Sequence, residues 1–144
     1  MGKFLRALLA VLLGLVIGSA INMGLIMVSG SLIPPPAGAD VTTMEGLKAA
    51  LPLFEARHFV FPFLAHALGT LAGAFMAGLM APARSAMPAY VVGACFLAGG
   101  IANVVMLPAP VWFCALDLLL AYGPMAWLGQ ALAARVRLDG SRAA

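Results

Sequence analysis

The sequence is poor in charge: only 9% of its 144 residues are Lys, Arg, Asp or Glu, whereas 64% are hydrophobic. A soluble globular domain carries about 25% charged and about 45–50% apolar residues. A chain of this composition has too few polar side chains to cover a water-facing surface. The composition therefore excludes an ordinary soluble domain, and we expect lipid to surround most of the chain.

Charged residues are missing altogether from four long runs. Each run is bounded by two charged residues: Arg6 and Asp40, Arg57 and Arg84, Arg84 and Asp117, and Asp117 and Arg135. A helix that crosses a bilayer needs about 20 predominantly apolar residues, and its backbone groups must be satisfied within the segment. The runs predict an all-α membrane protein, a four-transmembrane-helix bundle with helices at about 5–29, 58–82, 86–107 and 111–134.

Outside these helices the sequence leaves one sizeable segment and one short one. One connects the first two helices at 30–57, and the other is a charged cytoplasmic tail at 135–144. No internal repeat marks a second folding unit, so we expect a single integral membrane domain over residues 1–144. Within the last helix, Gly123-Pro124 predicts a break, because proline has no backbone N–H to donate.

The connecting segment contains a pattern typical of a short amphipathic helix. Thr42 and Glu45 have the spacing of a capping box, and Met44, Leu47 and Leu51 recur on one face of the helix that would follow. Such helices lie on the membrane surface. We expect a short periplasmic amphipathic helix between the first two membrane helices, serving either as a surface connector or as a lid over the bundle.

Basic residues are distributed unevenly. Six of the eight lie on one side of the expected helices: Lys3, Arg6, Arg84, Arg135, Arg137 and Arg142. Because cytoplasmic segments carry an excess of Lys and Arg, we expect a bacterial inner-membrane protein with both termini in the cytoplasm. The basic start and Gly18-Ser19-Ala20 resemble a signal peptide. The apolar run is longer than the usual core of about 7–15 residues, however, so we expect it to be retained.

Cysteine is also scarce. Cys95 and Cys114 form no C-x-x-C motif, so nothing in the sequence supports membrane thiol oxidation. A basic stripe with interleaved aromatic residues is missing as well, which argues against a nucleic-acid partner. The expected partners are the lipid bilayer and, given the abundance of small residues, further copies of the chain or a larger membrane complex.

Small residues recur every four positions along the first three expected helices. Such stripes let another helix approach closely, and packing and hydrogen bonds then hold the helices together in lipid. The helix-packing positions that this pattern predicts are Gly14, Gly18, Gly69, Gly73 and Gly99.

A strongly polar residue lies on or beside the stripe of each helix. These residues are Asn22, His66 (with Thr70), Asn103 and Asp117. At the helical rise they fall about 6–12 Å below the predicted periplasmic boundary. The sequence therefore predicts one buried polar layer, whose members are candidate ligand- or ion-binding residues.

Asp117 dominates this layer energetically. A carboxylate in hydrocarbon is costly unless it is paired or protonated, and the four apolar runs contain no Lys or Arg. Its candidate partners are His66 and the two asparagines. The layer is either a clamp that fixes helix register or a working site for protons, cations or a ligand.

Three functions are consistent with this layer, and we favour the first, which is non-enzymatic. The first is a structural, assembly or accessory subunit. The second is a small proton- or cation-coupled transporter or channel that uses Asp117 and His66. The third is a lipid- or quinone-modifying enzyme with His66 as the acid or base. No metal or cofactor site is expected. Small multidrug exporters carry an acid in their first helix, where this chain has Asn22.

Overall fold

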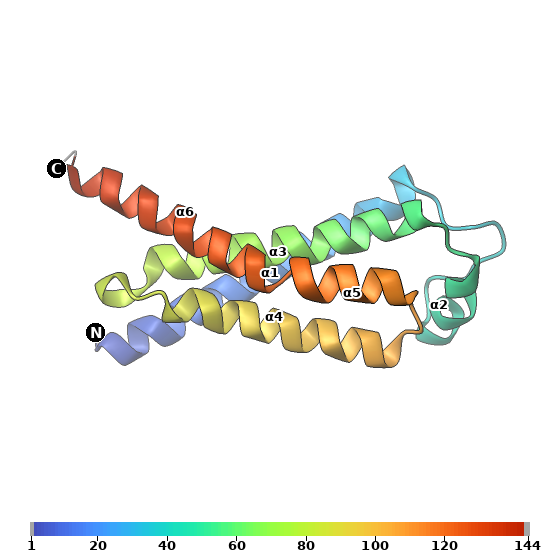
Figure 1. Ribbon diagram of the computed structural model, residues 1–144, viewed down its shortest axis with the longest axis horizontal. Coiled ribbons are helices and arrows are strands. Elements are labelled where there is room, and N and C mark those ends of the chain that lie inside the picture. Colours follow the sequence, from blue (N-terminus) through green and yellow to red (C-terminus); the bar gives the residue numbers. More distant parts are fainter. Residues whose placement is uncertain (1, 143–144) are drawn as a thin grey trace.

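Long apolar helices make up most of the structure (Figure 1). The computed structural model describes residues 2–142, with side chains described for residues 2–138. Its elements, including short 3-10 helices labelled η, are α1 (Lys3–Leu32), α2 (Met44–Ala50), η1 (Leu51–Leu53), η2 (Ala56–Phe59), α3 (Val60–Met80), η3 (Pro82–Arg84), α4 (Met87–Met106), α5 (Val111–Leu120) and α6 (Gly123–Arg142). The part of the chain described contains no strand.

Four segments are long and apolar enough to cross a membrane. They are Lys3–Leu32, Ala56–Met80, Met87–Met106 and Val111–Leu138. The prediction of an all-α chain with four such segments is confirmed. Large apolar side chains cover their outward flanks, among them Val105 and Val111 at 81% and 85% exposure. A soluble monomer rarely exposes so much apolar surface, so the chain is compatible with a small membrane protein.

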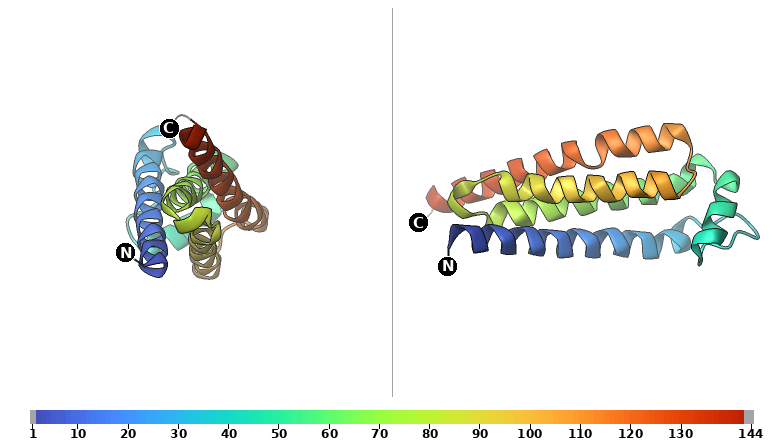
Figure 2. Two further views of the ribbon diagram at one scale, coloured as in Figure 1. Left: turned by 90° about the vertical axis from the view of Figure 1, so that its left-hand side faces the viewer. Right: turned by 90° about the horizontal axis from the view of Figure 1, so that it is seen from below.

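The helix α3 lies at the centre of the arrangement. It packs against α1, α4 and α6, and the four long segments run side by side in all views (Figures 1 and 2). Both ends of the chain lie at the same end of the molecule as the turn between α3 and α4. The short helix α2 lies at the opposite end (Figure 1).

The last apolar segment consists of two helices rather than one. Ala121 and Tyr122 form a turn between α5 and α6. Pro124, the second residue of α6, has no N–H to offer the carbonyl of Leu120, which accounts for the break expected there. The chain therefore changes direction close to the predicted polar layer.

The helix α6 is longer than predicted. It continues to Arg142, whereas the sequence indicated an end near 134 and a tail at 135–144. Residues 135–142 include three Arg and one Leu, which are strong helix formers. Their charge marks the end of an apolar run but does not end the helix.

The helix α2 occurs where the sequence predicts a short helix, but its cap is shifted by one residue. Gly46 donates its backbone N–H to Thr43 Oγ1 at 3.0 Å, so Thr43 is the N-cap. The predicted cap, Thr42, instead donates from its backbone N–H and hydroxyl to Asp40 Oδ1 at 2.8 and 2.6 Å. These hydrogen bonds from Thr42 hold the pKa of the Asp40 carboxyl below its usual value.

Two pairs of glycines bring α1 and α3 into backbone contact. A Cβ on Gly14 would lie 2.6 Å from the carbonyl oxygen of Gly73, and a Cβ on Gly18 would lie 2.6 Å from that of Gly69. Side chains larger than hydrogen would push the helices apart. These four predicted positions are therefore where the two helices touch, as small residues permit in membrane proteins.

Gly99 does not share this role in the part of the chain described. A Cβ placed on Gly99 would meet no atom within 4 Å, whereas one on Gly100 would overlap the ring of Tyr122. Neighbouring residues on a helix differ by about 100° in direction. On α4 the close contact therefore falls at Gly100, next to the predicted Gly99.

The glycine contact predicts a stability difference between two similar variants. Gly18→Ala should lower the free energy of unfolding by about 1–3 kcal/mol, because overpacking must separate α1 from α3. Gly24→Ala is the control on the same helix, since its Cβ would meet nothing within 4 Å. Thermal denaturation in detergent, followed by circular dichroism, measures both. Equal stability of the two variants would contradict the contact.

Candidate functional site

The imidazole of His66 and the carboxylate of Asp117 are in direct contact. Nδ1 of His66, on α3, lies 2.9 Å from Asp117 Oδ1 and 3.0 Å from Oδ2, on α5. The side chain of Asp117 is 3% exposed and that of His66 15%. Thr70, one turn further along α3, donates its hydroxyl to the backbone carbonyl of His66 at 2.7 Å. The two ionisable members of the predicted polar layer are thus brought together.

Tyr122 completes this cluster, and the sequence did not identify it. Its hydroxyl donates to Asp117 Oδ2 at 2.9 Å, and its ring centroid lies 5.8 Å from that of His66. In a continuous helix, residues five apart point about 140° away from each other, so Tyr122 would not reach Asp117. The break after α5 allows the contact. A phenol immediately before Gly123-Pro124 was the available signal.

The hydrogen bonds determine how His66 presents its ring. An ionised carboxylate can only accept hydrogen bonds. With Asp117 ionised, Nδ1 of His66 must therefore carry a hydrogen and donate it. The other nitrogen, Nε2, then accepts a hydrogen bond when the ring is neutral and donates one when it is protonated.

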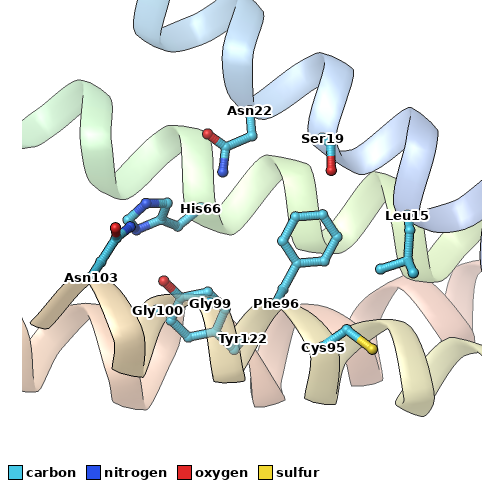
Figure 3. A pocket seen from close by; sticks show the side chains of 10 residues that line it. All are labelled: Leu15, Ser19, Asn22, His66, Cys95, Phe96, Gly99, Gly100, Asn103 and Tyr122. Atoms are coloured by element: carbon cyan, nitrogen blue, oxygen red, sulfur yellow. The ribbon is translucent and has the colours of Figure 1, made fainter. Parts of the chain in front are cut away.

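An open groove of about 350 Å³ lies beside this cluster, between α1, α3 and α4. Its polar lining consists of Ser19, Asn22, His66, Asn103 and Tyr122. Figure 3 shows Ser19 and Asn22 pointing from α1 into the space that His66 and Asn103 border. The groove offers hydroxyl, amide and imidazole groups to a solute within an otherwise apolar molecule.

A second, apolar cavity of about 230 Å³ lies on the α2 side of the cluster. Leu47 of α2 and Leu51 of η1 line it at one end, and His66 and Asp117 line it at the other. His66 and Asn103 border both this cavity and the groove. The imidazole of His66 therefore lies between the polar groove and the apolar cavity.

The structure places the five predicted polar residues in different roles. His66 and Asp117 touch, Thr70 is buried and bonds to the backbone, and Asn22 and Asn103 line the groove. No hydrogen bond joins either asparagine to the cluster within residues 2–138. The described side chains include no group of three or more His, Cys, Asp or Glu that could hold a metal ion.

No family model, no curated protein and no solved structure matches this chain. The site must therefore be interpreted from its own chemistry. That chemistry consists of a buried carboxylate, an imidazole with one nitrogen fixed, and a phenol that donates to the same carboxylate.

Tyr122→Phe should lower the free energy of unfolding more than Tyr90→Phe does. Removing the hydroxyl leaves a buried carboxylate oxygen with one donor fewer, which costs about 1–3 kcal/mol. Tyr90→Phe is the control, since Tyr90 is 44% exposed on α4. Thermal denaturation in detergent compares the two. A Tyr122→Phe protein as stable as Tyr90→Phe would show that the phenol does not stabilise Asp117.

Proposed function

We propose that the chain is a multi-pass protein of the bacterial inner membrane, in which the four long segments form a transmembrane bundle. Its termini would lie in the cytoplasm and α2 on the periplasmic surface. Charge supports this orientation. Lys3, Arg6 and Arg84 belong to the end that carries both termini, whereas Lys48 and Arg57 belong to the α2 end (Figure 1). An excess of basic residues marks the cytoplasmic side.

Within this bundle we propose a proton-coupled site for a small solute, as in a small transporter. One observation carries the proposal: the imidazole of His66 borders an open groove, while its counter-charge Asp117 is buried at 2% exposure. Histidine gains and loses protons near neutral pH. Because Nδ1 is occupied by Asp117, Nε2 can exchange a proton with the groove without disturbing the buried contact.

The groove supports the same function through its other side chains. Ser19, Asn22 and Asn103 supply donors and acceptors opposite or beside His66. Pockets for small molecules combine apolar walls with a few convergent polar groups, and ionisable residues within membrane helices mark pathways for ions and substrates. Protonation of His66 would change Nε2 from an acceptor into a donor towards a bound solute. Proton uptake and solute binding would thereby be coupled.

A second candidate is a structural, assembly or accessory subunit in which the cluster is a clamp. One observation favours it: Asp117 joins three elements. It lies on α5 and bonds to α3 through His66 and to the turn before α6 through Tyr122. Such hydrogen bonds commonly fix membrane helices in register. A clamp would need no proton exchange at His66.

Proton exchange can be measured without knowing the solute. Proteoliposomes on a solid support should give a transient charge displacement after a pH jump, because a proton enters a site within the membrane. His66→Gln should abolish this current, and His58→Gln should retain it, since His58 lies in η2 and bonds to the backbone of its N-cap, Glu55.

Two results would contradict the proton-coupled site. One is a current that persists in folded His66→Gln protein. The other is folded wild-type protein that gives no current at all, which would favour the clamp.

The orientation has its own test. Alkaline phosphatase fused within the segment between α1 and α2 should be active, because the enzyme matures only in the periplasm. A green fluorescent protein fused to the C-terminus should fluoresce, as it does in the cytoplasm. The reverse pattern of activity would overturn the proposed topology while leaving the His66 site intact.

A further inference from the structure

The apolar cavity beside the polar cluster is not used by the proton exchange proposed for His66. Its volume is about 230 Å³. An engineered apolar cavity of about 150 Å³ stays dry and takes up a benzene molecule. Voids larger than a water molecule are few in protein interiors, because the atoms around a void lose packing contacts. A cavity of this size is therefore a candidate binding site for an apolar group.

Aromatic rings form part of the cavity wall. Phe54, Phe59 and Phe113 all line it, and the ring centroid of Phe59 lies 6.0 Å from that of Phe54 and 4.7 Å from that of Phe113. Phe59 and Phe113 are buried with Leu51 in one apolar cluster, so packing holds their rings at the edge of the cavity. Aromatic rings attract one another in offset and edge-to-face arrangements. The cavity can therefore hold a further ring against these three.

Polar side chains lie where the cavity adjoins the groove. His66 and Asn103 line both spaces, and their side chains extend towards each other from α3 and α4 (Figure 3). Because Nδ1 of His66 donates to Asp117, Nε2 of the neutral ring is an acceptor. The hydrogen bonds of residues 2–138 include none to this Nε2 and none to the side-chain amide of Asn103. Polar groups within a membrane segment are costly without a partner, so both groups are available to a ligand.

These two partners select an uncharged hydroxyl group. A hydroxyl can donate to Nε2 of His66 and accept from the amide of Asn103. A carbonyl or ether oxygen can only accept, and so leaves Nε2 of the neutral ring without a donor. An anion would lie close to the carboxylate of Asp117, and an ammonium group would carry its charge into an apolar cavity. Both are costly.

We propose that the solute of the His66 site is a small phenol, whose uncharged ring occupies the apolar cavity and whose hydroxyl donates to Nε2 of His66. The inference rests on the proton-coupled solute site proposed above and names the class of solute that the site takes. Pockets for small molecules commonly have this form, with hydrophobic and aromatic walls and a few polar groups that fix orientation.

Nitrogen-15 NMR measures binding at Nε2 directly, with the full chain in nanodiscs, labelled at histidine and assigned with His58→Gln. Titration with para-propylphenol should shift the Nε2 signal of His66 until the site is saturated. The methyl ether para-propylanisole has the same ring and chain but no hydrogen to donate. It should bind about fivefold more weakly, because one hydrogen bond is lost.

Two adjacent valines on α4 test the cavity itself. Val104 lines it, whereas Val105 is 81% exposed. Val104→Phe should weaken the binding of para-propylphenol about tenfold, because the new ring takes the space in which about two carbon groups of the ligand would be buried. Val105→Phe is the matched control and should bind the phenol as the wild type does.

Tighter binding of the phenol than of the ether, lost in Val104→Phe and retained in Val105→Phe, would support the proposal. Equal affinity for the two compounds, or equal binding by the two folded variants, would overturn it. The comparison of the two compounds in the wild type decides should Val104→Phe not fold.

The pH-jump current separates this inference from the proposed function. A current in wild-type protein that binds no phenol would overturn the phenol site alone. Binding of the phenol by wild-type protein that gives no current would support the phenol site and contradict the proton coupling.

Discussion

The buried carboxylate of Asp117 is the constraint on which the polar site depends. A charge in an apolar interior is costly unless it is paired and hydrogen-bonded. His66 and Tyr122 meet this requirement with contacts of 2.9 to 3.0 Å. Each partner has a structural consequence. His66 ties α3 to α5, and Tyr122 reaches the carboxylate only because the chain turns between α5 and α6. The helix break and the cluster are therefore parts of one arrangement.

The glycine contacts determine where the groove opens. Because Gly14 and Gly18 lie against Gly73 and Gly69, α1 approaches α3 closely on one side of His66. Asn22, one turn beyond Gly18, lies against Gly69 and points its side chain into the groove (Figure 3). At the far end of α3, arginines cap the helix and leave guanidinium nitrogens unpaired. One central helix thus carries His66 of the polar cluster towards α2 and the carbonyls that the arginines cap towards the termini.

Much of the fold could be predicted because hydropathy, proline and the spacing of small residues are local signals. The four apolar segments, the break at Gly123-Pro124 and the glycines of α1 and α3 all follow from them. The features that could not be predicted depend on the rotation of a helix about its axis and on the exact residue at which a helix begins. The sequence predicted a contact at Gly99, and the structure has it at the neighbouring Gly100. It predicted Thr42 as the cap of α2, and the structure has Thr43. Tyr122 was missed because its contact with Asp117 exists only once the helix is broken. The length of α6 could not be predicted from charge, because charged residues end an apolar run without ending the helix.

The tautomers of the two histidines test the central claim most directly. Bonding to Asp117 requires a hydrogen on Nδ1 of His66, whereas Nδ1 of His58 accepts the backbone N–H of Glu55 at 2.9 Å and so leaves the hydrogen of the neutral ring on Nε2. Nitrogen-15 NMR of histidine-labelled protein, assigned with His58→Gln, distinguishes them. The account predicts opposite tautomers, with Nδ1 of His66 protonated in both its neutral and its charged form. A neutral His66 that carries its hydrogen on Nε2 would contradict it.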